Sequence, residues 1–299
     1  MKDSNHFAVL AIILSAFLLL PLQGFAADIA INQDTVWEQG VYSYDNVSII
    51  DGAKLIFKGS VTLNCANLTV AVGASILADG MGYPGQLTIS GMNGPGGGVS
   101  EGGSNVTGSG AGYGGRGGDG HDFAGGQAYG DAAHPVDLGS GGGKASGPGG
   151  DDNPVAGGSG GGAVGLNVPG TLRVDGRISS DGGSGDFRSG LIVTYGSGGG
   201  SGGSIYITTG NLTGSGVISA KGGNGGFGPP PSGGVARLGG GGAGGRVAIY
   251  ARTSGFSGTF QAQGGIGHKA GEDGTVLEFL GNEYQNVRVI SGNVKVSGT

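Results

Sequence analysis

The chain has 299 residues, and 77 of them are glycine, whereas an average protein contains about 7% glycine. Only 12% of the residues are charged and the formal net charge is −6, so no basic stripe is available to neutralise phosphates and nucleic acid is not an expected partner. Collagen is excluded because it needs glycine at every third position, and residues 139–144 (GSGGGK) break that period.

The first segment has the pattern of an export signal. Lys2 precedes an apolar run over residues 7–20, Pro21 ends the run, and Gly24-Phe25-Ala26 offers a small-x-small cleavage site. We therefore expect residues 1–26 to be a signal peptide and the protein to be secreted or displayed at the cell surface. A second long apolar run is not found, so the mature chain is predicted to lack a membrane-spanning segment.

Residues 27–80 are poor in glycine and contain short apolar stretches separated by turn residues. The stretches lie at residues 47–49, 55–57, 61–63, 68–70 and 76. Alternation of apolar and polar residues is typical of half-buried strands. Cys65 is the only cysteine, is in phase with Val61 and Leu63, and is predicted to be a core residue without a disulfide.

Residues 81–160 are the richest in glycine and have few apolar residues. This segment is either an ordered excursion from the fold or a mobile loop. Long loops without structure are uncommon in compact domains, so we favour partial order.

Residues 161–280 contain a repeat of about 42 residues. Val164, Ile205 and Val247 occupy equivalent positions that are 41 and 42 residues apart. Each unit combines short alternating strands with glycines, which we interpret as tight turns with positive φ. The expected fold is all-β, a parallel β-helix or β-solenoid with glycine-rich turns and insertions, in which stacked coils bury a shared apolar stripe.

The end of the chain raises two questions: which side chains of its last strand face the core, and whether a further coil begins after that strand. In residues 275–279 we expect Leu277 and Phe279 to face the core, because the other phase would bury Glu278. Residues 286–292 (NVRVISG) echo residues 46–52 (NVSIIDG). Residues 281–299 are therefore predicted to begin a further coil, either truncated or covered by end-to-end self-association.

Several runs carry a family resemblance. They include Tyr113-Gly114-Gly115-Arg116-Gly117-Gly118, the stretch of residues 197–205 and the stretch of residues 239–247 (GGGGAGGRV). This pattern is similar to the glycine-rich repeat region of large secreted or surface proteins of bacteria, and to plant glycine-rich proteins. The resemblance covers most of residues 40–280. It implies a β-helical, extracellular, structural or adhesive module, and no established catalytic residues.

Two sets of side chains are candidate binding residues. Tyr206 and Tyr250 occupy neighbouring repeat positions, and Tyr206 should face outward, so the two rings could form a platform for sugar rings. Asp119 lies in a run that approaches a calcium-binding repeat, and Asp151-Asp152 could offer oxygen ligands. Calcium is thus the only cofactor to consider, and a solvated turn is the simpler interpretation of each aspartate.

Charged residues after Leu172 give the only enzymatic alternative. Arg173, Asp175 and Arg177 alternate and are expected to share the outer face of one strand, as a polysaccharide lyase would need for a base and cations. A solvent-facing ion pair is the simpler interpretation of these residues.

The favoured function is therefore a non-enzymatic, secreted or surface β-solenoid for structure or adhesion, with polysaccharide or other surface proteins as partners. A β-helix lyase or hydrolase and a passive spacer within a larger surface protein are the alternatives.

Overall fold

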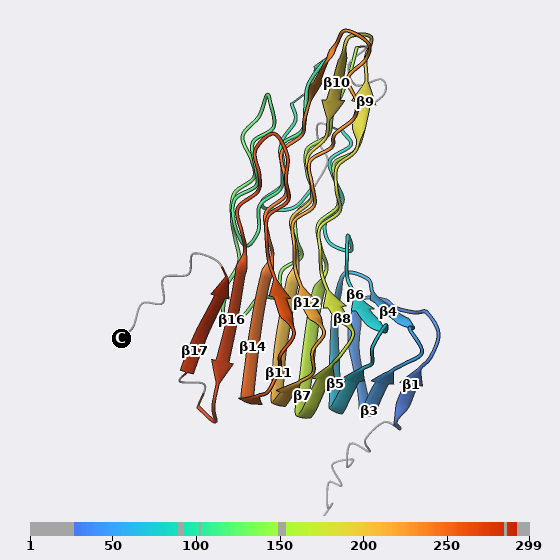
Figure 1. The fold of residues 1–299 in the computed structure, drawn as a ribbon, viewed down its shortest axis with the longest axis vertical. Helices are drawn as coiled ribbons and strands as arrows, with labels where there is room; N and C mark the ends of the chain where they lie inside the picture. Colours follow the sequence, from blue (N-terminus) through green and yellow to red (C-terminus); the bar gives the residue numbers. More distant parts are fainter. Residues whose placement is uncertain (1–26, 89–92, 102, 149–153, 284–285, 292–299) are drawn as a thin grey trace, which may run out of the picture.

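A computed structural model describes residues 27–88, 93–101, 103–148, 154–283 and 286–291. The predicted signal peptide and the Asp151-Asp152 pair lie outside these residues. The described chain is all-β and contains no helix, and thus none long and apolar enough to span a membrane. Its strands form two main sheets and a small third sheet at the far end of the molecule (Figure 1).

The largest sheet has eight strands. In spatial order they are β1 (Ile29–Ile31), β3 (Gly40–Ile49), β5 (Ser60–Val70), β7 (Ala163–Val174), β11 (Ser204–Thr213), β14 (Arg246–Ser254), β16 (Thr275–Leu280) and β17 (Asn286–Ser291). All neighbours are parallel except β16 and β17, which are antiparallel.

The second sheet has six short parallel strands. In spatial order they are β15 (Thr259–Gln261), β12 (Val217–Ser219), β8 (Arg177–Ser179), β6 (Ser75–Leu77), β4 (Lys54–Phe57) and β2 (Thr35–Trp37). From β1 to β16 the chain alternates between the two main sheets, apart from the strands of the third sheet that are inserted after β8 and β12. The third sheet joins β13 (Val235–Arg237), β10 (Val193–Gly196) and β9 (Phe187–Ser189).

The predicted repeat sets the strand register. Val164 pairs with Ile205 and Ile205 pairs with Val247, as the sequence alignment indicates. Inward-facing residues of the two main sheets form one apolar core, which runs from Ile31 near the N-terminal end to Val276 in β16. Cys65 belongs to this core, as predicted, and burial raises the pKa of its thiol to about 12.

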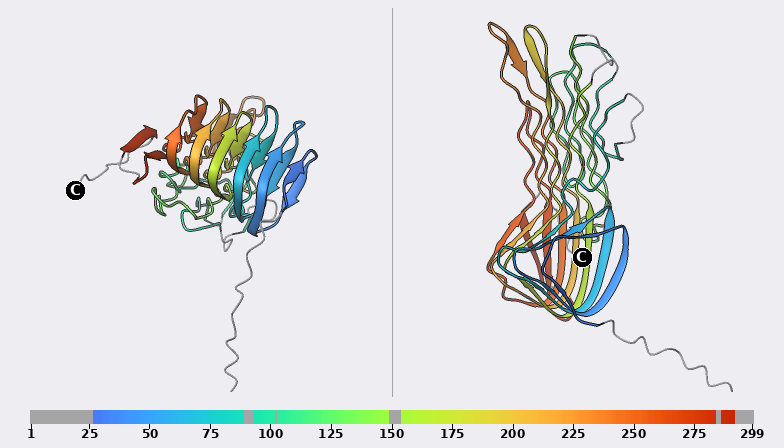
Figure 2. Two further views of the ribbon diagram at one scale, coloured as in Figure 1. Left: turned by 90° about the horizontal axis from the view of Figure 1, so that it is seen from below. Right: turned by 90° about the vertical axis from the view of Figure 1, so that its right-hand side faces the viewer.

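The glycine-rich segments form a hydrogen-bonded bundle above the two sheets (Figures 1 and 2). Successive backbone N–H groups donate to three different neighbouring segments, and the pattern repeats after three residues. The hydrogen bonds run from Ser197 to Asp186, from Gly198 to Gly143 and from Gly199 to Gly240, and the next three run from Gly200 to Gly183, from Ser201 to Ser140 and from Gly202 to Ala243. Three residues per turn without internal hydrogen bonds is the geometry of the polyproline II helix.

Glycine is required in this bundle because neighbouring backbone segments approach each other closely. A Cβ added to Gly200 would lie 2.1 Å from the carbonyl oxygen of Ser159, and one added to Gly198 would lie 1.8 Å from that of Ser109. The interpretation of the glycines as turn formers was therefore wrong for most of them. Among the described residues of 161–280, only Gly214 and Gly233 have a positive φ.

The described parts of residues 81–160 belong to this bundle. They leave the two main sheets after β6 and the chain returns to the large sheet at β7, which pairs directly with β5. Their N–H groups donate to later segments, for example from Gly108 to Gly196 and from Ala111 to Gly199. The ordered excursion, rather than the mobile loop, describes these residues.

Two expectations for the end of the chain need correction. Val276 and Glu278 face the core, and Glu278 is 1% exposed, whereas Leu277 and Phe279 lie on the outer face. The buried carboxylate is tolerated because one of its oxygens lies 3.7 Å from the guanidinium of Arg288 on β17. β17 itself runs antiparallel to β16 and so does not begin a further parallel coil.

Candidate functional site

The outer face of the large sheet carries columns of side chains set by the strand register. Because side chains alternate along a strand, the neighbours of inward Val164 and Leu166 point outward. One outward column contains Thr62, Gly165 and Tyr206, which are paired across β5, β7 and β11. Gly165 has no side chain, so this column is interrupted in its middle.

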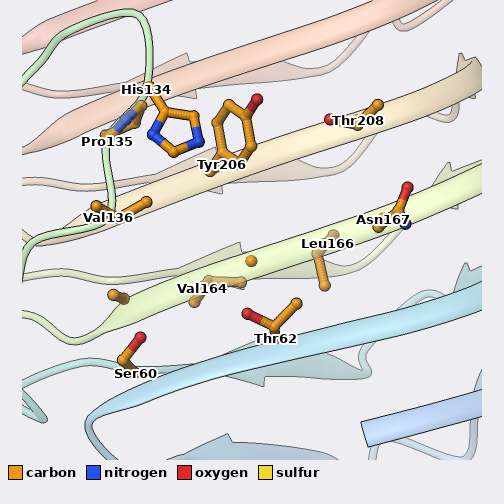
Figure 3. A pocket seen from close by; sticks show the side chains of 12 residues that line it. Ser60, Thr62, His134, Pro135, Val136, Val164, Leu166, Asn167, Tyr206 and Thr208 are labelled. Carbon is orange, nitrogen blue, oxygen red and sulfur yellow. The ribbon is translucent and has the colours of Figure 1, made fainter. Parts of the chain in front are cut away.

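A groove of about 450 Å³ lies over this interruption. Figure 3 shows Thr62 on one side of the groove and Tyr206 on the other. A Cβ on Gly165 would lie only 2.9 Å from the hydroxyl oxygen of Thr62, so glycine keeps the floor of the groove open. The full lining is Ser60, Thr62, His134, Pro135, Val136, Ala163, Val164, Gly165, Leu166, Asn167, Tyr206 and Thr208.

A strap formed by residues 130–138 supplies one wall of the groove. His134, Pro135 and Val136 of this strap reach the groove, although they are far from the sheet strands in sequence (Figure 3). The hydroxyl of Tyr250 donates a hydrogen bond of 3.0 Å to the carbonyl of Ala133. The sheet thus holds the strap in place from below.

Buried polar groups fix both ends of the strap. At its start, the guanidinium of Arg246 donates to the carbonyl of Tyr129 at 2.7 and 3.0 Å. Near its end, the hydroxyl of Ser204 donates to the carbonyl of Asp137 at 2.6 Å and also shares a 2.6 Å hydrogen bond with the hydroxyl of Tyr113. Burial raises the pKa of Tyr113 to about 12, so this phenol stays protonated at neutral pH.

Aromatic rings form a row that borders the groove. The ring of His134 meets Tyr206 edge to face at 4.5 Å, Tyr206 meets Tyr250 edge to face at 5.7 Å, and Tyr250 stacks on Phe279 at 4.4 Å. The structure confirms that Tyr206 faces outward and brings it together with Tyr250. The two rings are offset by two residues along the strands, because Tyr206 pairs with Ala248 and Tyr250 with Thr208.

The two tyrosines therefore have different positions relative to the groove. Tyr206 lines it directly, whereas Tyr250 lies outside the lining and supports the strap. Sequence reasoning missed Gly165 and His134. An isolated glycine within the alternating strand pattern was the available signal for Gly165, since it marks a site of close approach.

The charged residues after Leu172 do not share one strand. β7 ends at Val174 and Arg177 begins β8 in the other sheet, so the expectation of a common face was wrong. Asp175 is paired with Arg173, whereas Arg177 is paired with Asp181 at 2.6 Å. The three side chains therefore belong to two separate ion pairs and do not form one cluster on a common strand face.

The predicted calcium ligand Asp119 is already engaged. One carboxylate oxygen accepts from the ammonium of Lys269 at 2.8 Å and the other from the backbone N–H of Gly125 at 2.9 Å. The hydrogen bond from Lys269 is the main cause that lowers the pKa of Asp119. Within the described residues, no three His, Cys, Asp or Glu side chains are grouped as a metal site would need.

A second, smaller hollow of about 270 Å³ lies beside Asp181 and Lys221, where the six-stranded sheet meets the bundle. Asp181 accepts hydrogen bonds from the hydroxyl of Ser219 and the backbone of Lys221, and pairs with Arg177. Its carboxylate is fully used in holding successive segments together, which makes the groove over Gly165 the stronger candidate.

Comparison with models of protein families, with curated proteins and with solved structures finds no match to this chain.

Proposed function

We propose that the chain is a secreted or cell-surface β-solenoid with a structural or adhesive role, and that it binds polysaccharide in the groove over Gly165. The alternation of the chain between two stacked parallel sheets supports the solenoid architecture. The export-type pattern of residues 1–26 supports a location outside the cytoplasm.

One observation carries the assignment of the ligand class. The groove places the ring of Tyr206 opposite small polar side chains, with the hydroxyls of Ser60, Thr62 and Thr208 and the amide of Asn167 around its edge. A sugar ring presents an apolar face that suits an aromatic ring, and equatorial hydroxyls that suit hydroxyl and amide partners. None of the residues that line the groove is Asp, Glu, Lys or Arg, so we expect a neutral rather than an anionic glycan.

The groove is only partly enclosed, which fits a polymer better than a small ligand that is buried completely. Two walls are rigid because they belong to the sheet, and the third is the strap anchored by Arg246 and Tyr250. Such a preformed site loses little conformational freedom on binding. Binding would require no catalytic step, and the favoured function remains non-enzymatic.

The test is retention on a panel of insoluble and immobilised neutral polysaccharides. Tyr206→Ala should weaken retention about tenfold, because it removes one ring face from the ligand. Gly165→Val should weaken it at least as much, because the added side chain fills the groove. Gly255→Val is the matched control, since nothing lies within 4 Å of a Cβ at Gly255 and that residue is outside the groove.

Equal retention of the wild type and of both groove variants would contradict the assignment. Retention of none of the proteins on any glycan would favour the passive spacer within a larger surface protein. Cleavage of a polysaccharide that is lost in Asp175→Ala or Arg177→Ala would favour the lyase alternative.

A further inference from the structure

The end of the bundle that lies farthest from the two main sheets carries an exposed apolar cluster. Two neighbouring loops, one containing β9 and β10 and the other leading to β13, project there (Figure 2, right). We call the exposed side chains on these loops the apolar tip. Those that are more than half exposed are Leu191 (89%), Ile192 (68%), Phe227 (62%) and Val235 (56%).

The two loops are fastened to each other, so their apolar side chains cannot fold back into a core. β10 pairs in parallel with β13, and the N–H of Val235 donates to the carbonyl of Ile192 at 2.9 Å. The hydroxyl of Thr194 donates to the carbonyl of Pro229 at 2.8 Å. The apolar tip is therefore held rigidly in an exposed position, which is typical of a surface that another molecule or a membrane covers.

The amino-acid composition of the two loops indicates which kind of partner covers the apolar tip. Residues 189–196 and 227–236 contain no charged residue and no histidine. Their only exposed polar side chains are those of Ser189 and Ser232. Pro229, Pro230 and Pro231 lack backbone N–H donors, which lowers the cost of placing this loop in a medium poor in hydrogen-bonding partners.

We infer that the apolar tip inserts into the interfacial region of a neutral lipid bilayer. A protein partner would surround apolar anchors with directional polar contacts, for which this tip offers almost no side chains. A convex pair of loops also suits a deformable surface. The net charge of −6 opposes attraction to anionic headgroups, so the apolar contact must supply the binding and neutral headgroups are favoured.

The arrangement of charges at the base of the tip agrees with insertion as far as the interfacial region. Arg188 and Arg237 both pair in register with Tyr195 of β10, so the two cations that flank the uncharged stretches lie at one level. Arg237 also lies 3.9 Å from the carboxylate of Asp122. Insertion down to this level would leave these charges at the headgroups and would remove none of them from water. The inference is independent of the groove, which lies on the outer face of the large sheet.

The test is flotation with vesicles of phosphatidylcholine alone. Residues 1–26 are removed from all proteins alike, because their apolar run would itself enter lipid and the described fold begins at residue 27. The wild type should float with the vesicles, and the triple variant Leu191→Ser, Ile192→Ser, Phe227→Ser should lose at least tenfold in partitioning. Partitioning should change little between low and high salt.

Val72→Ser is the matched control. Val72 is 80% exposed in the turn between β5 and β6, outside the apolar tip, and its replacement should leave flotation unchanged. A second measurement places a tryptophan at the tip. The emission of Leu191→Trp should shift to the blue on addition of vesicles, whereas that of Val72→Trp should not.

Equal flotation of the wild type and the triple variant, or no flotation of either, would overturn the inference. Tip-dependent attachment to cells that protein digestion of the cell surface abolishes would also overturn it, in favour of a protein receptor. Retention on polysaccharide should be the same in the wild type and the triple variant. The membrane inference and the proposal of a polysaccharide groove can therefore fail independently of each other.

Discussion

At the scale of single residues, the most constrained positions are glycines whose neighbours are backbone atoms. A Cβ on Gly110 would lie 1.9 Å from the carbonyl oxygen of Gly241, and a backbone carbonyl cannot rotate away as a flexible side chain can. Glycine content in this chain is therefore a packing requirement, and each such residue contributes to the spacing of several segments at once.

We expect Gly110→Ala to lower the free energy of unfolding by about 1–3 kcal/mol, because the methyl group forces two hydrogen-bonded segments apart. Gly255→Ala, where the new methyl group meets nothing within 4 Å, should change stability by less than about 0.5 kcal/mol. Urea unfolding of the two variants measures the difference. Similar midpoints for both would contradict the packing argument.

Glu278 is the least suited residue of the core. Its side chain lies in register with Ile249, one carboxylate oxygen has no hydrogen-bond partner, and the other faces the exposed side chain of Arg288. Replacing a buried ion pair by an apolar residue is often neutral or stabilising by about 1–4 kcal/mol. Glu278→Met should thus raise the urea midpoint or leave it unchanged. A large loss of stability would show that the carboxylate has a partner outside the described residues.

At the scale of elements, the strap of residues 130–138 depends on the strands beneath it. Loss of the hydroxyl in Tyr250→Phe removes the hydrogen bond to Ala133, so amide hydrogen exchange over residues 130–138 should accelerate several-fold. Tyr42→Phe is the control, because it also deletes a hydroxyl that donates to a backbone carbonyl, that of Glu38, but lies elsewhere. Unchanged exchange in Tyr250→Phe would mean that Arg246 and Ser204 alone position the strap.

At the scale of the whole molecule, three buried acidic groups predict sensitivity to alkali. Burial raises the pKa of Cys65 to about 12 from an ordinary value of 9.0, raises that of Tyr113 to about 12 from 10.0, and raises that of Tyr129 as well. Because the folded state favours the protonated forms, their contribution is complete below pH 9 and is lost as the pH rises toward 12.

The urea midpoint should therefore be flat from about pH 7 to 8.5 and fall progressively above about pH 9. The double variant Cys65→Ala, Tyr113→Phe should show a shallower fall, because it removes two of the groups that ionise on unfolding. Absorbance of phenolate recorded in parallel identifies the tyrosine step. The same slope in the wild type and the double variant would contradict the assignment.

The sequence was informative where side chains carry the pattern. The repeat of about 42 residues predicted the pairing of Val164, Ile205 and Val247, and the alternation of apolar residues within a strand predicted the outward position of Tyr206. The bundle was missed because its segments pair mainly through backbone groups and leave no apolar period. The groove was missed for another reason, since His134 reaches Tyr206 only through the tertiary path of the strap. The phase of residues 276–278 was wrong because the compensating Arg288 sits on a strand whose antiparallel direction the sequence does not reveal.

The direct pairing of β5 with β7 has a consequence for how the protein is made. Asn64 and Asn167 become hydrogen-bonded neighbours although 103 residues separate them. At about 5–20 residues per second, a ribosome delivers β7 roughly 5–20 s after β5, so the edge of β5 waits unpaired for that time. Contacts at such separations also make folding slow. A chain that is kept unfolded until its export is complete would present both strands together, and thereby avoid a long interval in which an open strand edge invites aggregation.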